Sequence, residues 1–380
     1  MPLLQFMPWC PIDKPHVVGN ITLIPFCRDE RIAGLDELTA CRVRTILASY
    51  KDLEGHPVRT ATLVRYENRD LLAELNEKEM EDTRDWVSLA CFAALARRAY
   101  FNPVGPYCNA DSFVVYGQRF SDEPDFTGIV SRRREGRTID GRPLADTAIS
   151  IPVHGSPVKQ VLLDEALLTA LVSFRAAATA EEWGRWQNAI SCFNQANTDN
   201  DAVSYQVEWV LLCSACERIL DAAPKAKDVA RSFASTVAPT VAILASAAKR
   251  NSSKWSGSTA HLRYEWMKEF YGVRGAFAHG KLETKRPLVW TPLEHVVLAT
   301  IAFPLVARCL LVKSGQYVIT DDDQAVIDAF DKLVDADFLK LPADASGSLD
   351  SVLSRLVASA KAEVVKRRAV EALKELLQSS

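Results

Sequence analysis

The part of the chain that follows residue 157 carries helical patterns and no strand signal, and this restricts its fold more than any other feature does. Apolar side chains recur there at helical spacing. In residues 181–197, for example, Trp183, Trp186, Ile190 and Phe193 form one stripe. The predicted helices cover residues 161–179, 181–197, 201–223, 227–248, 258–279 and 292–313. The sequence therefore predicts an all-helical domain in this region.

The part before residue 157 has a mixed pattern. Short runs rich in β-branched residues, bounded by Pro or Gly, predict strands. Two other runs predict helices, and the run at residues 82–98 has the acidic start and basic end that the helix dipole favours. The predicted strands cover residues 16–25, 59–66, 112–117 and 147–153, and the predicted helices cover residues 35–50 and 82–98. The polar, arginine-rich residues 131–142 are interpreted as a solvated hairpin tip, with nucleic-acid sensing as the alternative.

These patterns predict an α+β protein: a mixed α/β N-terminal domain followed by an all-α helical bundle. The composition changes at residues 154–157, so the predicted N-terminal domain covers residues 1–155 and the helical domain covers 156–318. Residues 319–380 are predicted as a C-terminal helical extension that packs on the bundle. A chain of 380 residues is also too long for one ordinary core.

Composition narrows the classes of function and location. The net charge of -3 excludes a general affinity for nucleic acid, so any such binding requires a local basic patch. No apolar run approaches the ~20 residues of a membrane span, and the N-terminus lacks the pattern of a secretory signal. The nine cysteines are an odd number and lie scattered in apolar segments. We expect a cytoplasmic chain with reduced thiols and no membrane partner.

The residues from Tyr271 to Lys281 contain the strongest chemical motif. Arg274 and His279 stand near the end of a predicted helix that Gly280 terminates. An arginine offers forked donors to a phosphate, and a histidine can move a proton near neutral pH. Neither residue type requires a divalent ion, so no metal and no cofactor are expected. On a regular helix the two side chains point about 140° apart, so we expect a homodimer whose cleft takes residues from both copies.

The ordered helices around this motif resemble the HEPN superfamily, and most closely the Apea-like HEPN proteins. Residues 186–196 resemble the first core helix of the family, residues 207–220 the second and residues 270–280 the motif helix. The resemblance covers roughly residues 156–315. It implies a helical bundle that dimerises and cleaves RNA without a metal, in many members as a toxin or an anti-phage effector.

The resemblance also implies roles for single residues. Arg274 and His279 correspond to the catalytic pair, which implies attack of a ribose 2′-OH on the adjacent phosphorus. Many active members carry Asn, Asp or His directly after the arginine, whereas this chain has Gly275. The residues themselves, rather than the resemblance, suggest further roles. Glu217 lies on an otherwise apolar helical stretch and is expected to hold Arg274 in place, with a partly exposed glutamate of no special role as the alternative. Lys281, Lys285 and Arg286 are expected to contact RNA phosphates, with a solvated loop as the alternative.

Two hypotheses about function follow. The first is an endoribonuclease acting in defence or stress, whose N-terminal domain senses an unknown ligand or protein. The second is a catalytically silent HEPN module that binds RNA, nucleotide or a protein partner, and Gly275 favours it. A purely structural dimer is a further alternative.

Other clusters carry weaker signals. Cys213 and Cys216 have the spacing of a redox or zinc motif but lie within a predicted helix, so core packing is the preferred interpretation. The acidic residues 321–323 are interpreted as a helix N-terminus rather than a metal site. The remaining histidines have no partner that the sequence identifies: His16, His56, His154, His261 and His295.

Overall fold

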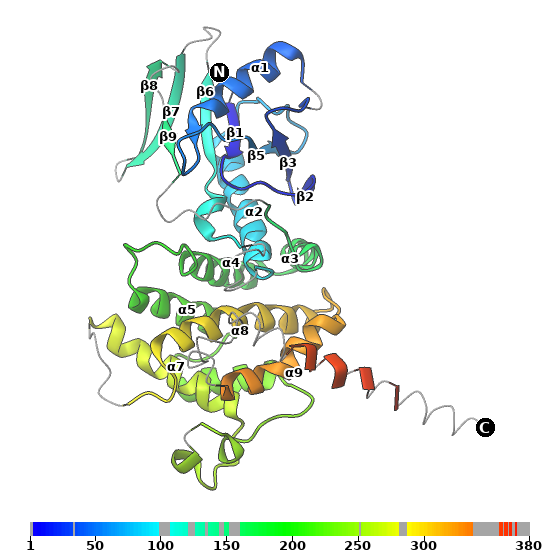
Figure 1. Ribbon diagram of the computed structural model, residues 1–380, viewed down its shortest axis with the longest axis vertical. Helices are drawn as coiled ribbons and strands as arrows, with labels where there is room; N and C mark the ends of the chain where they lie inside the picture. Colours follow the sequence, from blue (N-terminus) through cyan, green and yellow to red (C-terminus); the bar gives the residue numbers. More distant parts are fainter. Residues whose placement is uncertain are drawn as a thin grey trace, which may run out of the picture. The chain divides into compact units, whose positions relative to one another are not determined.

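The chain forms two compact units in the computed structural model (Figure 1). The first unit comprises residues 1–98, 104–172 and 197–202, and the second comprises residues 99–103, 173–196 and 203–380. The structure describes residues 3–32, 35–98, 107–120, 126–133, 136–143, 148–151, 160–250, 252–280, 287–336, 357–359, 361–363, 365–366 and 369–370. The chain therefore combines a sheet with helices, which confirms the α+β class. The predicted domain boundaries after residues 155 and 318 stay predictions.

The first unit is built on an antiparallel sheet in the strand order β2-β3-β5-β1-β6-β7-β8. The strands are β1 (Leu3–Met7), β2 (His16–Val18), β3 (Ile21–Cys27), β5 (Thr60–Tyr66), β6 (Tyr116–Phe120), β7 (Phe126–Arg133) and β8 (Gly136–Pro143). The short strands β4 (Tyr50–Lys51) and β9 (Ile149–Ser150) pair in parallel separately.

Residues 131–142 do belong to a hairpin, but the predicted tip is too long, because β7 and β8 pair from Phe126–Pro143 to Arg133–Gly136. Their polar sequence fits this position, since β8 ends the sheet order and edge strands tolerate charged residues. The sequence also missed β1, which lies between β5 and β6 and is buried along its whole length.

One face of this sheet packs on helix α1 (Glu37–Ala48). Leu4 and Phe6 of β1 share a buried cluster with Val43 and Ile46 of that helix. Helix α2 (Glu77–Leu95) contacts the turn between β2 and β3, where Gly19 has a positive φ of 55° and lies against the Trp86 ring. Asp82 of α2 accepts hydrogen bonds from Asn20 (2.9 Å), Tyr66 (3.0 Å) and Trp86 (3.0 Å).

The second unit is helical (Figure 1). Helix α4 packs on α5, α5 packs on α7 and α8, and α6 packs on α7. Helix α3 begins in the first unit and ends in the second. The helices are α3 (Glu165–Ala177), α4 (Ala180–Gln195), α5 (Tyr205–Ile219), α6 (Ala226–Thr236), α7 (Leu262–Ala278), α8 (Pro292–Lys313) and α9 (Asp321–Asp335). Each of the six helices predicted over residues 161–313 is present, although one prediction extends too far, and most of the predicted extension beyond residue 336 lies outside the described residues.

The helix predicted over residues 227–248 ends at Thr236. Pro239 explains the stop, because proline has no N–H and disfavours the α conformation in the residue before it. Most of the remaining residues form segment 240–250, which contains a short 3-10 helix (Ala245–Ala247) and four backbone N–H groups that donate to one face of α9. Asp328 accepts from Thr240 (2.6 Å), Asp331 from Ile243 (2.8 Å), and Asp335 from Lys249 and Arg250 (2.8 and 3.1 Å).

Helix α8 corrects another expectation, that no apolar run is long enough to span a membrane. Its 22 residues are long and apolar enough by length and composition alone. Most of them are buried, and a core helix has the same length and apolar composition. Helix α8 is therefore the central core helix of the second unit.

Candidate active site

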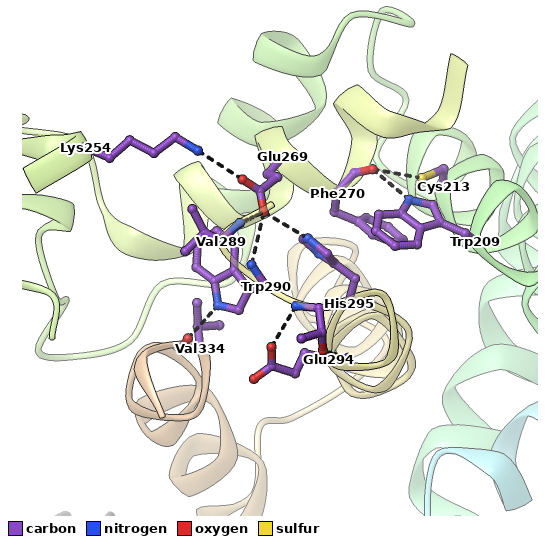
Figure 2. A network of polar contacts seen from close by, with 11 residues as sticks. Trp209, Cys213, Lys254, Glu269, Phe270, Val289, Trp290, Glu294, His295 and Val334 are labelled. Atoms are coloured by element: carbon purple, nitrogen blue, oxygen red, sulfur yellow. Dashed lines mark hydrogen bonds and ion pairs between the residues drawn. The ribbon is translucent and has the colours of Figure 1, made fainter. Parts of the chain in front are cut away.

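Helix α7 carries the Arg274–His279 motif and is held tightly against α5. The indole Nε1 of Trp209 donates to the carbonyl of Phe270 (2.8 Å), and the two rings stack with centroids 5.2 Å apart. The Cys213 thiol contacts the same carbonyl at 3.7 Å (Figure 2). Phe270 and Trp209 are fully buried, so the position of the motif helix is determined by close packing on α5.

Arg274 forms an ion pair with Glu217 across the α5–α7 contact. Its Nη1 lies 2.6 Å from Glu217 Oε2 and 2.6 Å from the hydroxyl of Tyr271. The Tyr271 hydroxyl itself donates to Glu217. Burial, together with this hydrogen bond to Glu217, raises the pKa of Tyr271, so the phenol stays protonated. The structure thus brings Glu217 to Arg274 and adds Tyr271, which the sequence did not single out.

A third helix, α4, lies beside this ion pair. The Nη1 of Arg218 is 3.8 Å from the Cys192 thiol. Burial raises the pKa of Cys192, while Arg218 and Arg274 oppose the rise. The thiol therefore stays protonated, and both guanidinium groups lie close enough to act on it.

His279 occupies the C-cap of α7. Its backbone N–H donates to Gly275 (3.2 Å), and Gly280 follows with a positive φ of 72°, as a glycine stop requires. The side chain of His279 is exposed and has no hydrogen bond to another residue that the structure describes. The imidazole is therefore open to solvent and to a substrate or a second chain.

Two exposed glycines flank Arg274 closely on α7. Gly272 and Gly275 are exposed, and a Cβ placed on Gly275 would meet no atom within 4 Å. Because Gly275 has no side chain, the position directly after Arg274 is open space. Lys281, Lys285 and Arg286, predicted to contact RNA, lie outside the described residues.

A second polar network, which the sequence did not predict, lies between α7 and α8 (Figure 2). Glu269 accepts from the backbone N–H groups of Val289 (2.8 Å) and Trp290 (3.2 Å) and lies 3.2 Å from Nε2 of His295. Lys254 pairs with its other oxygen at 3.2 Å. Since a carboxylate only accepts, Nε2 of His295 carries the proton. This network anchors the chain where it enters α8.

His295 is completely buried among aromatic rings. Its centroid lies 4.7 Å from that of Trp209 and 5.8 Å from that of Trp290. Burial lowers the pKa of His295 below its usual 6.5, although Glu269 opposes the shift. For Glu269, burial alone would raise the pKa, but the hydrogen bonds from His295 and the two backbone N–H groups outweigh it, so the net pKa falls. The pair therefore consists of a neutral imidazole and a carboxylate, in a structural role.

The other singled-out residues have structural surroundings. Cys213 and Cys216 are fully buried, and burial raises the pKa of Cys216 to about 12, so these thiols pack in the core. Asp323 forms a capping box with Thr320 at the start of α9, as expected for a helix N-terminus. His261 is the N-cap residue of α7. His56 is described and exposed, whereas His154 lies outside the described residues.

His16 does have partners. Its Nε2 lies 2.9 Å from Asp13, and Glu165 brings a third ligand atom, all within 4.8 Å of one another. Within the described part of the chain, these three side chains could together hold a metal ion. Lys14 already pairs with Glu165 at 2.6 Å, however, and supplies a positive charge there.

Comparisons with known proteins found no relative of this chain. No family model matches the chain. No curated protein and no solved structure matches it either.

Proposed function

We propose that this chain is a HEPN-type endoribonuclease that cleaves RNA without a metal. In this mechanism a base removes the proton from a ribose 2′-OH, which attacks the adjacent phosphorus. Arg274 stabilises the charge that grows on the non-bridging oxygens, and His279 transfers a proton as base or as acid to the leaving 5′-oxygen. The products are a 2′,3′-cyclic phosphate and a 5′-hydroxyl.

One observation carries the proposal: Arg274 is held by Glu217 at 2.6 Å on the same helix whose end exposes His279. A guanidinium that a carboxylate holds in place is preorganised to bind an anion. The Arg274 side chain is also 31% exposed, so a substrate can reach it. The exposed imidazole five residues later supplies the second group that the chemistry requires. The resemblance of the surrounding helices to the HEPN superfamily supports the same assignment.

The proposed enzyme is a homodimer. Arg274 points to α5, whereas His279 lies at the helix end, so a single copy presents the two groups separately. The exposed Gly275 on α7 leaves room for a second helix to approach, because a Cβ there would meet no atom within 4 Å. Mixing Arg274→Ala subunits with His279→Ala subunits should restore cleavage, because a heterodimer keeps one intact copy of each residue.

The decisive experiment incubates the purified protein with labelled RNA in EDTA. We expect cleavage to persist without metal, to leave ends that require phosphate removal before ligation, and to spare DNA, which lacks the 2′-OH nucleophile. His279→Ala should lower the rate by at least ~10²-fold. Cleavage that appears only with magnesium or manganese, or a wild-type rate in His279→Ala, would refute the mechanism.

A second candidate function is a silent HEPN module that binds RNA, nucleotide or a protein partner. The open space at Gly275 favours it, because the polar group that many active members place there is missing. The same assay separates the two: RNA binding without cleavage, in any buffer, supports the silent module.

The biological setting that we propose is a cytoplasmic defence or stress response in which the N-terminal region restrains the nuclease. Because an unrestrained ribonuclease harms its own cell, this region is proposed to sense a ligand or protein. Lys281, Lys285 and Arg286 are proposed to bind the RNA backbone.

A further inference from the structure

We propose that Tyr271 is a positioning residue that aims Arg274 at a phosphodiester of the substrate, an inference that rests on the proposed function. Tyr271 stands one turn before Arg274 on α7, so their side chains are neighbours. Its hydroxyl accepts from Arg274 Nη1 at 2.6 Å and donates to Glu217. One hydroxyl thus joins the cation and its counterion in a closed three-way contact.

The Tyr271 hydroxyl affects how many nitrogens of the Arg274 guanidinium form hydrogen bonds within the protein. Nη1 of Arg274 donates to both Glu217 and Tyr271. Within the described part of the chain, Nε and Nη2 donate to no residue. A side-on carboxylate would engage two nitrogens of the fork, which is the geometry that a phosphate also needs. By occupying Glu217 and holding Nη1, Tyr271 leaves a two-donor edge for the substrate.

Burial and ring geometry support this role. Tyr271 is only 5% exposed. Burying a hydroxyl costs free energy unless it is hydrogen-bonded, and this hydroxyl both donates and accepts a hydrogen bond. The centre of the Arg274 guanidinium lies 5.4 Å from the ring centroid, which limits its movement from a second direction. A phenylalanine would keep the ring contact and lose the two hydrogen bonds, so this substitution isolates the hydroxyl.

The test compares Tyr271→Phe with Tyr264→Phe in the full chain. Tyr264 is the matched control, since it lies on the same helix under Lys268, with 5.6 Å between ammonium and ring centroid. Three quantities are measured: RNA cleavage as kcat/KM, anisotropy binding of a 2′-O-methyl RNA that cannot be cleaved, and thermal unfolding. We expect Tyr271→Phe to remain folded and to lose about tenfold in binding and in kcat/KM, the loss of a hydrogen bond to a charged group. Tyr264→Phe should match the wild type.

A double variant distinguishes positioning from a merely structural role. If the hydroxyl acts through Arg274, Tyr271→Phe should cause little further loss in an Arg274→Lys background. Additive losses, or wild-type binding and cleavage in Tyr271→Phe, overturn the proposal. If Tyr271→Phe does not fold, Glu217→Gln takes its place, and wild-type binding in that variant overturns the proposal as well.

The binding arm separates this inference from the proposed nuclease. A wild-type protein that binds the methylated RNA but cleaves no RNA refutes the nuclease. In that case, the binding affinity of Tyr271→Phe alone tests the role of Tyr271. A wild-type protein that does not bind the methylated RNA overturns the role of Tyr271 as well.

Discussion

At the scale of single residues, what a position tolerates depends on what its side chain would meet. Gly19 and Gly275 illustrate the two extremes. A Cβ on Gly19 would lie 2.3 Å from the Trp86 ring, and the backbone there has a positive φ, whereas a Cβ on Gly275 meets open space. The first glycine is therefore required by the fold, and the second is free to change.

Gly19→Ala should lower the free energy of unfolding by about 2 kcal/mol or more, because overpacking and a left-handed backbone penalty act together. Urea denaturation monitored by tryptophan fluorescence measures the loss. Gly55→Ala is the control, because Gly55 also has a positive φ but no atom lies within 4 Å of its Cβ. Equal losses in the two variants would show that the Trp86 contact contributes nothing.

Gly275→Asn should raise the rate of RNA cleavage if the chain is a HEPN nuclease, since it restores a polar side chain next to Arg274. Stability should not fall, because an exposed helix interior favours most residues over glycine by roughly 0.5–1 kcal/mol. Cleavage assays and thermal unfolding measure the two effects. A slower enzyme of unchanged stability would contradict the interpretation of Gly275 as a weakened position.

His295 should make the protein less stable in acid. Its pKa is lowered in the folded state, so below the unfolded value near 6.5 the unfolded chain binds a proton that the folded chain refuses. Stability from this group is therefore complete above that pH and falls as the pH drops toward the folded pKa, by up to about 1.4 kcal/mol per pH unit. Urea denaturation at pH 7.5 and 5.5 measures it.

The control for this prediction is His295→Gln, which removes the titrating ring. Glu269, Lys254, Glu294 and Arg250 remain around the site in both proteins. We expect the variant to be less stable at pH 7.5 but to lose less stability between the two pH values than the wild type does. An identical loss in both proteins would assign the pH dependence to other groups.

At the scale of elements, helices were easier to predict than strands. The stripe in α4 and the Pro at the start of α8 identify those helices, because an amphipathic helix is encoded within one segment. By contrast, β7 and β8 are held by backbone pairing that their polar side chains do not reveal. Pro239 was a visible signal that the helix of α6 ends early, and the prediction overlooked it.

The contact of α9 with segment 240–250 includes a buried aspartate, Asp331. Asp331 is fully buried in an ion pair with Arg263 at 3.0 Å and also accepts from Ile243. Asp331→Ala should cost about 3–5 kcal/mol, because it leaves a buried cation unpaired. Asp322→Ala, at an exposed pair on the same helix, should cost less than about 1 kcal/mol. Urea denaturation compares the two, and equal costs would rule out a special role for the buried pair.

At the scale of the whole molecule, the sequence predicted a sheet-containing part followed by a helical part, but not the long-range contacts that join distant segments within one unit. Residues 197–202, between α4 and α5, belong to the first unit, where the Asn197 side chain accepts from buried Arg98. Contacts over 99 sequence positions arise only from tertiary packing. The same holds for the site: Arg274 and His279 follow from a local motif, whereas the hydroxyl of Tyr271 is recognised only once α5 is in place.

Deletion of residues 1–155 should change RNA cleavage markedly, in either direction, if the N-terminal region regulates the nuclease. Regulation requires that this region contact two states of the protein differently. Because residues 160–172 and 197–202 belong to the first unit, circular dichroism must first show that the truncated chain folds. A folded, truncated protein that cuts RNA at the full-length rate with the same preference would assign the region a separate task.

The aspartates of α9 also bear on how the sequence of this chain can drift. They hold segment 240–250 largely through main-chain N–H groups, which every residue except proline provides. Side chains such as Val241, which is 69% exposed, therefore carry little structural information. Substitutions should accumulate at such exposed positions while Asp328, Asp331 and Asp335 persist. For the same reason, Val241 is a suitable place to attach a fluorophore or an affinity tag.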